Sequence, residues 1–147
     1  MNQGEFQAFA GRRVLLLQGP VGSFFKRLSQ DLTCSGAQVF KVNFHAGDWL
    51  FYPRNAMSYR KPMAQWPAWL QAQVEHLRID LIFLFGDCRP IHRAALQVAQ
   101  RLGVEVGVFE EGYIRPNFVT LERLGVNGHS SLLRTSNQFC PEDTSLP

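Results

Sequence analysis

Short apolar runs alternate with amphipathic stretches along most of this chain, and this alternation is what most constrains its fold. The short runs have the length and composition of strands, and they cover residues 13–17, 39–44, 79–85 and 104–109. The stretches between them carry apolar residues at helical spacing, starting near residue 21, at Pro67 and at Pro90. Strands that alternate with helices pack as a parallel sheet with right-handed crossovers. The sequence therefore predicts an α/β fold: a Rossmann-like parallel sheet with flanking helices.

The length of the chain fits one such domain. Its 147 residues, 46% of them hydrophobic, can bury one core but are too few for two ordinary domains. We expect a flexible N-terminus over 1–12, the Rossmann-like domain over 13–128 and an irregular tail over 129–147. Near the end of the domain we expect a short helix over 118–124 and a turn over 125–128.

A long irregular stretch, residues 45–63, interrupts the alternation. Loops of this length are uncommon in compact domains and are usually functional or mobile. Aromatic and basic residues are mixed in it: Trp49, Phe51, Tyr52, Tyr59, Arg54, Arg60 and Lys61. Two interpretations stay open. The stretch is either an interface for a sugar, a phosphate or a lipid headgroup, or a loop folded over the domain with its aromatic residues in the core.

Charge and cysteine usage narrow the class of protein. The net charge of +3 and the pI near 9.0 suit an anionic ligand or a membrane surface, but they fall short of a nucleic-acid-binding signature. The three cysteines, Cys34, Cys88 and Cys140, are far apart and match no metal-ligand spacing. The first residues lack the pattern of a secretory signal, and no apolar run approaches the roughly 20 residues that span a bilayer. We therefore expect a cytoplasmic protein with free thiols and no bound metal.

Candidate site residues follow the predicted strands. Because the carboxyl ends of parallel strands share one edge of a sheet, the loops at 18–20, 86–89 and 110–112 should converge there. Each contains glycine, so backbone amides can approach a ligand closely. The helix that begins at Pro90 offers its N-terminal N–H groups to an anion, with Arg89 and His92 beside it.

Less specific interpretations of these residues stay open. Asp87 is as well explained by bonding within its own turn, His92 by a solvated position on a first helical turn, and Glu110-Glu111 by an exposed acidic turn. A carboxyl group among other acids and buried strand ends can also have a raised pKa, which suits acid–base catalysis. The chain lacks the lysine and hydroxyl residue of a P-loop, and GxGxxG follows no predicted strand.

Four segments together carry a resemblance to a known family: LLLQGPVGSFFKRL, KVNFHAGDWLFYP, FLFGDCRPIHRAA and VFEEGYIRPNFVTLERLGVNGHS. In this order they resemble capsule polysaccharide biosynthesis and export proteins of the KpsS/LipB type, from about Leu15 to Ser131. The resemblance implies a β-Kdo glycosyltransferase, which transfers the sugar acid Kdo from CMP-Kdo to a phosphatidylglycerol-type lipid and so starts the capsule linker. It also implies the N-terminal domain of a GT-B fold, capsule assembly and export proteins as partners, a peripheral position on the inner membrane, and no cofactor.

The resemblance also suggests roles for individual residues. Glu110-Glu111-Gly112 is similar to the acidic motif of bacterial enzymes that use CMP-sugars, which makes Glu111 the candidate catalytic carboxylate and Glu110 its support. The candidate substrate-binding residues are Gln18, Gly19, Asp48, Asp87, Arg89, His92, Arg115 and Asn127. The chain has no His-Pro dipeptide, which family members carry in a second domain. We therefore expect a truncated, N-terminal half that is inactive alone. The alternative is a non-catalytic export or assembly module that acts through protein contacts.

Overall fold

The computed structural model describes residues 9–18, 22–86, 89–111 and 119–124, and within them the predicted α/β fold is confirmed. Six strands form one sheet in the order β3-β2-β1-β4-β5-β6. The first five are parallel, and β6 runs antiparallel to β5. The strands are β1 (Arg13–Leu16), β2 (Gln38–Asn43), β3 (Met57–Ser58), β4 (Leu81–Phe85), β5 (Glu105–Glu111) and β6 (Val119–Leu124).

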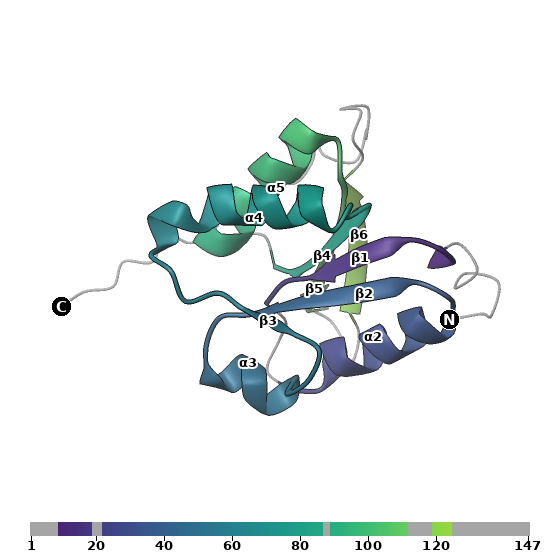
Figure 1. Cartoon of the computed structure of the whole chain (residues 1–147). Helices are drawn as coiled ribbons and strands as arrows, with labels where there is room; N and C mark the ends of the chain where they lie inside the picture. Colours follow the sequence, from purple (N-terminus) through teal and green to yellow (C-terminus); the bar gives the residue numbers. More distant parts are fainter. Residues whose placement is uncertain (1–8, 19–21, 87–88, 112–118, 125–147) are drawn as a thin grey trace.

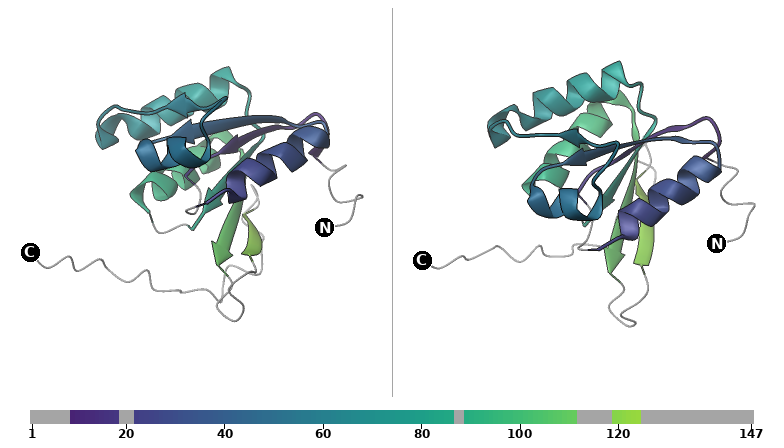
Figure 2. Two further views of the ribbon diagram at one scale, coloured as in Figure 1. Left: turned by 90° about the horizontal axis from the view of Figure 1, so that it is seen from below. Right: turned by 60° about the horizontal axis from the view of Figure 1, so that its bottom comes forward.

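Helices cover both faces of the sheet (Figure 1). One face carries α4 and α5, and the other carries α2, with the short α3 beyond the end of β2 (Figures 1 and 2). The helices are α2 (Phe24–Cys34), α3 (Ala46–Phe51), α4 (Trp66–His76) and α5 (Pro90–Leu102), and a short 3₁₀ helix, η2 (Met63–Gln65), precedes α4.

The two hydrophobic cores follow from the alternation of side chains along the strands. In β1 and just after it, Leu15 and Leu17 face α4 and α5, while Val14 and Leu16 face α2. All four side chains are fully buried. Burying one such side chain stabilises the fold by about 1.5–3 kcal/mol, so a continuous apolar run predicts a strand covered on both faces.

Helix α5 begins and ends where its sequence indicates. Pro90 occupies its first turn, where a missing N–H costs nothing, and Gly103 ends it in the left-handed conformation at φ 69°. Its buried face includes Ala95, Val98 and Ala99. The Trp66 indole N–H donates to the Ile91 carbonyl at 3.0 Å, which fixes the start of α4 against the first turn of α5.

Strand order defines the place where a ligand is expected. From β1 the chain proceeds to β2 and β3 on one side, and then returns to β4 on the other side of β1. In open α/β sheets the crevice outside the carboxyl ends of such diverging strands is the usual ligand site. Gln18 follows β1 at this edge, and Arg89 lies between β4 and α5.

The structure corrects two expectations from the sequence. The predicted loop 45–63 contains α3, β3 and the start of η2, because a six-residue helix and a two-residue strand are too short to give a periodic signal. The predicted helix over 118–124 was wrong, since residues 119–124 form β6, whose sequence VTLERL alternates over 119–122 and pairs with β5.

Strand β5 extends further than predicted. Glu110 and Glu111 are its last two residues, in register with Thr120 and Val119 of β6. The acidic pair therefore lies in the strand itself, at the end of the β5–β6 ribbon where the chain passes from β5 to β6. At the other end of the chain, Phe9 packs against Phe83 with ring centroids 6.2 Å apart. Residues 1–8 and the expected tail over 129–147 lie outside the described residues.

Candidate functional site: a basic pocket at the carboxyl edge

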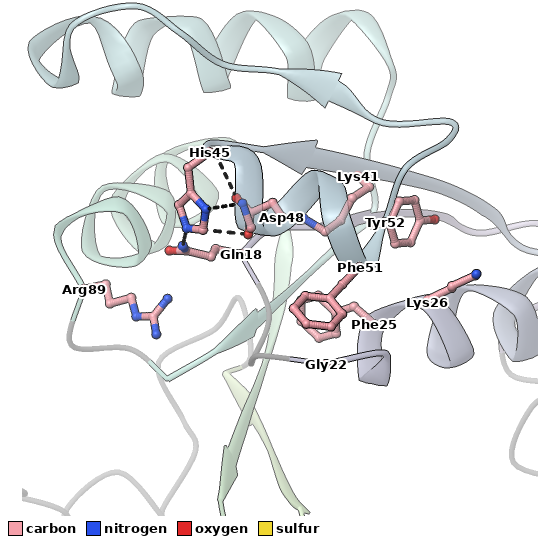
Figure 3. A pocket seen from close by; sticks show the side chains of 11 residues that line it. Gln18, Gly22, Phe25, Lys26, Lys41, His45, Asp48, Phe51, Tyr52 and Arg89 are labelled. Atoms are coloured by element: carbon pink, nitrogen blue, oxygen red, sulfur yellow. Dashed lines mark hydrogen bonds and ion pairs between the residues drawn. The ribbon is translucent and has the colours of Figure 1, made fainter.

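A pocket of about 170 Å³ lies at the carboxyl edge of the sheet, beside the ends of β1 and β2 (Figure 3). Its walls come from five parts of the chain: the segment after β1, the start of α2 with the residues before it, strand β2, the α3 segment and the residue before α5. The lining residues are Gln18, Gly22, Phe25, Lys26, Lys41, His45, Gly47, Asp48, Phe51, Tyr52 and Arg89.

Polar contacts hold Gln18, His45 and Asp48 together on one wall (Figure 3). The Gln18 carboxamide lies 2.8 Å from His45 Nε2. His45 Nδ1 accepts from the Gly47 N–H at 3.1 Å, which fixes the orientation of the ring. Asp48 Oδ1 lies 3.8 Å from His45 Nε2, close enough for an ion pair when the ring is protonated. The three side chains thus link the end of β1 to α3.

Helix α3 is held at the end of β2 by a reciprocal cap. His45 is its N-cap, and Asp48 Oδ2 accepts from the backbone N–H groups of Phe44 at 2.8 Å and His45 at 3.3 Å. These bonds satisfy donors that a helix start leaves without intrahelical partners. Gly47 lies close beside the imidazole: a Cβ there would be 3.0 Å from His45 Cε1 and 3.1 Å from Nδ1, so the ring would have to shift by a few tenths of an ångström. Asp48 therefore positions the pocket wall as well as lining it.

Lys41 is the buried cation of the site. Its side chain points to the α2 face of the sheet, because the neighbouring Val42 packs in the core on the α4/α5 face. Only 3% of the residue is exposed. Its Nζ donates to the Val42 carbonyl at 2.6 Å and to Asn43 Oδ1 at 2.9 Å, and it lies 5.9 Å from the centre of the Tyr52 ring. Figure 3 shows the side chain between Asp48 and Tyr52.

Burial changes the acidity of this ammonium group. Loss of hydration lowers the pKa of Lys41 from 10.5 to about 8, and the charge of Asp48 acts in the opposite direction. At neutral pH Lys41 is therefore still mostly charged, and it loses its proton in mildly alkaline solution. A buried lysine is costly unless its charge is used, and lysines of this kind are concentrated at functional sites.

The rest of the pocket combines positive charge with aromatic surface. Lys26 and Arg89 are exposed at its rim. Phe25, Phe51 and Tyr52 supply apolar walls, and Phe25 packs edge-on against Phe109 of β5 at 6.2 Å between centroids. Among the described lining residues, basic side chains outnumber carboxylates. Such a site suits an anionic ligand that also has an apolar or sugar-like part.

The structure brings together three of the residues predicted as substrate-binding: Gln18, Asp48 and Arg89 all line the pocket. His92 is elsewhere. It is fully buried rather than solvated, and its Nδ1 lies 2.5 Å from the Gly86 carbonyl, where it fixes the loop between β4 and α5. A histidine on a first helical turn gives no sequence signal that separates these two environments.

The proposed catalytic pair belongs to a strand next to the switch point. The backbone of β5 lies two strands from β1, about 10 Å at the usual spacing of a sheet, and it carries Glu110 and Glu111 at its end. Four other predicted site residues lie outside the described residues: Gly19, Asp87, Arg115 and Asn127.

Sequence reasoning missed several pocket residues. Lys41 alternates with apolar neighbours, which is the pattern of a solvent-facing position on a half-buried strand, and only the covering of this face by α2 makes the position internal. His45 had a detectable signal, because His45 and Asp48 stand at the N-cap and N3 positions of a helix. Phe25 and Lys26 are brought to the pocket by tertiary packing alone, whereas Phe51 and Tyr52 belong to the stretch 45–63, for which a sugar, phosphate or lipid interface was one of the two interpretations.

The described part of the chain has neither a cluster of metal ligands nor a helix that could cross a membrane. No group of three or more histidine, cysteine or acidic side chains there is arranged to hold a metal ion. None of the helices in residues 9–18, 22–86 and 89–111 is long and apolar enough to cross a membrane.

The fold and the pocket define a class: a Rossmann-like α/β domain with a basic ligand site at its topological switch point. A solved structure, the epimerase Mth375 from Methanothermobacter thermautotrophicus, shares this fold with a TM-score of 0.51 at 20% identity, over 69% of this chain and 35% of that chain.

Sequence comparisons identify the family. The family "Capsule polysaccharide biosynthesis protein" matches residues 80–147. The chain is 41% identical to the capsule polysaccharide export protein KpsS of Escherichia coli over 127 residues, which cover 85% of this chain and 32% of KpsS. It is also 41% identical to the capsule polysaccharide modification protein LipB of Neisseria meningitidis over 140 residues, 93% of this chain and 33% of LipB.

Residues 80–147 match the capsule polysaccharide biosynthesis family, and the chain is homologous to KpsS and LipB over most of its own length. This confirms the resemblance inferred from the motifs. The family match also reaches further along the chain than the resemblance, which ended near Ser131, because it continues to residue 147. The chain spans about a third of the length of these curated relatives.

Proposed function

We propose that this chain forms part of a capsule-linker glycosyltransferase that transfers Kdo from CMP-Kdo to a phosphatidylglycerol-type lipid. The observation that carries the proposal is the basic pocket at the switch point of a domain homologous to KpsS and LipB. Both proposed substrates carry phosphate groups, and Kdo is itself a carboxylic acid. A site in which Lys26, Lys41 and Arg89 outnumber the carboxylate of Asp48 is electrostatically suited to such molecules.

In this proposal Glu111 is the catalytic carboxylate and Glu110 supports it. Support comes from the backbone, since both residues end β5 at the same edge as the pocket. The domain corresponds to the N-terminal half of a GT-B enzyme. The rest of the donor site, including a His-Pro motif, belongs to a second domain of the family's longer members.

The α3 segment is the proposed contact with the membrane that holds the lipid acceptor. Leu50 on α3 is 74% exposed, although it is a large apolar residue. Arg54, Arg60 and Lys61 are exposed in the segment that follows. An exposed apolar side chain near several cations is the combination that binds the surface of an anionic bilayer.

The proposal is tested in a chimera in which this chain replaces the matching third of Escherichia coli KpsS. The chimera should restore formation of Kdo-modified lipid from CMP-Kdo in a kpsS-deficient membrane extract, detected by mass spectrometry. Glu111→Gln should reduce the rate by at least about a hundredfold, the usual scale for loss of a catalytic acid or base. Full transfer by the Glu111→Gln chimera would rule out the catalytic role of Glu111, and no transfer by the unsubstituted chimera would favour the non-catalytic export or assembly module.

A further inference from the structure

Lys41 is both buried and part of the pocket wall, and described residues accept from two of its donors. An ammonium group has three N–H donors. Within the described residues, two of them go to the Val42 carbonyl and Asn43 Oδ1. The Asn43 amide in turn donates to the Tyr52 carbonyl at 3.0 Å, so the acceptor that orients Lys41 is itself fixed. The third donor can therefore serve a ligand in the pocket without breaking either protein contact.

The first turn of α2 borders the same pocket. Gly22, Phe25 and Lys26 are all lining residues, and α2 is an eleven-residue helix. Its first N–H groups have no intrahelical acceptor, and the N-cap Ser23 makes no side-chain capping bond to described residues of the turn. The Ser23 hydroxyl instead contacts Arg27 Nε at 3.2 Å. The positive end of the α2 dipole is thus available to an anion on the pocket side.

We propose that the pocket is an oxyanion site for one phosphate ester group, bound between the Lys41 ammonium and the first turn of α2. Lys26 and Arg89 at the rim attract the anion. Lys41 then binds it through an ammonium group that is buried away from water, where a charge-assisted hydrogen bond is strong. Phe25, Phe51 and Tyr52 leave apolar surface for the organic part of the ester. The inference rests on the proposed function only for the source of the phosphate, a lipid headgroup or a nucleotide.

Binding at this site should depend on pH. The charged and titratable groups around Lys41 are Asp48 and His45 at the start of α3, Tyr52 after it, Lys26 on α2 and Arg89 before α5. Burial lowers the pKa of Lys41 to about 8. An anion that requires the ammonium form therefore binds well below that pH and is lost above it, and the bound anion itself favours the protonated form.

Sulfate is the most direct probe, because its charge is constant over the relevant pH range. Its affinity for the 147-residue chain should be measured by calorimetry from pH 7.5 to 9.5, above the range in which histidine side chains ordinarily change charge. We expect the affinity to fall by about tenfold or more across this range, following the loss of one proton. A flat profile or no binding at millimolar sulfate would overturn the site, and neither result depends on a variant that folds.

Two variants test whether sulfate binds at Lys41. Lys41→Met should lower sulfate affinity at pH 7.5 by at least about tenfold and abolish the pH dependence. The matched control is Arg101→Met, which removes an exposed charge at the far end of α5 and should leave affinity unchanged. If both variants lost the same amount of sulfate affinity, the effect would come from the net charge of the chain, and the proposed site at Lys41 would be contradicted.

Competition distinguishes the two sources of phosphate. Displacement of sulfate by sn-glycerol 3-phosphate at the lower concentration identifies a lipid headgroup, and displacement by CMP identifies the nucleotide donor. Displacement by neither would overturn the assignment to a phosphate ester. Sulfate binding that persists when the chimera fails to transfer Kdo would leave the anion site standing and remove the proposed function.

Discussion

Lys41 Nζ donates a hydrogen bond to Asn43 Oδ1 at 2.9 Å, and both residues are almost completely buried. The two residues are two positions apart on β2, so they share one face of the strand. Asn43 also donates to the Tyr52 carbonyl, which closes the segment after α3 over the lysine. A single amide group thus supports the charge in the pocket and the wall beside it.

Replacement of Asn43 should destabilise the fold in a graded way. Asn43→Ala removes the acceptor of Lys41 and the donor of the Tyr52 carbonyl, so we expect a loss of about 2–4 kcal/mol in the free energy of unfolding. Asn43→Asp keeps an acceptor for Lys41 and should lose less. Urea unfolding at pH 7 measures both values. Equal stability of Asn43→Ala and the wild type would show that this bond contributes nothing to the fold.

Lys41 should give the fold a characteristic pH dependence. Its pKa is about 8 in the folded chain and 10.5 in the ordinary, exposed state, so between these values the unfolded chain binds more protons. Stability attributable to Lys41 therefore rises with pH from about 8 to 10.5, by at most roughly 3 kcal/mol, and it is constant below pH 8.

The difference between wild type and Lys41→Met isolates this effect from other groups that titrate in alkali. The free energy of unfolding of the wild type should increase relative to that of the variant as the pH is raised from 8 to 10. A difference that does not change over this range would contradict the lowered pKa of Lys41.

The cap of α3 provides a third test. Asp48→Ala removes the acceptor of the Phe44 and His45 N–H groups and should cost about 1–2 kcal/mol. It should also lower the pKa of Lys41 further, because the Asp48 charge raises it. The control is Asp31→Ala on the exposed side of α2. Thermal unfolding compares the two, and an equal effect of both substitutions would contradict the capping role.

The membrane contact predicts a result for vesicle binding. In liposomes that contain phosphatidylglycerol, Leu50→Asp and the combined change of Arg54, Arg60 and Lys61 to Ala should each reduce binding severalfold. About 1 kcal/mol per basic residue near an anionic surface sets the scale. Binding in a sedimentation assay that is unchanged in both variants would remove α3 and its following segment as the membrane contact.

The sequence was sufficient for four of the five parallel strands, β1, β2, β4 and β5, because their signals are local. A continuous apolar run such as 81–85 is fully buried only when helices cover both faces of the strand. Pro90 and Gly103 mark the two ends of α5. The β5–β6 ribbon was not predicted as such. Apolar and polar residues alternate only over 119–122, and the pairing of β6 with β5 depends on contacts distant in sequence.

Pocket residues could be predicted from the sequence where they directly follow strands. They could not be predicted where tertiary packing brings them to the pocket. Gln18 and Arg89 follow strands that diverge at the switch point, and both line the pocket. Lys41 could not be recognised, because a lysine on an alternating strand is equally consistent with solvent exposure. His92 was predicted as a site residue but lies outside the pocket. Its burial against Gly86 depends on the conformation of the β4–α5 loop, which the sequence does not reveal.

The most direct test asks whether the pocket binds a substrate of the proposed Kdo transfer. In the KpsS chimera, Lys41→Met should raise the KM of one phosphate-bearing substrate by at least about tenfold, because Lys41 binds the phosphate. If that substrate is the lipid acceptor, kcat should change little, whereas the phosphate of CMP-Kdo is the leaving group, so loss of its contact with Lys41 should also lower kcat. The substrate affected should be the one whose phosphate competes with sulfate in the isolated chain. Unchanged KM values for both CMP-Kdo and the lipid acceptor, in a chimera that transfers Kdo, would contradict the central claim that this pocket is part of the substrate site.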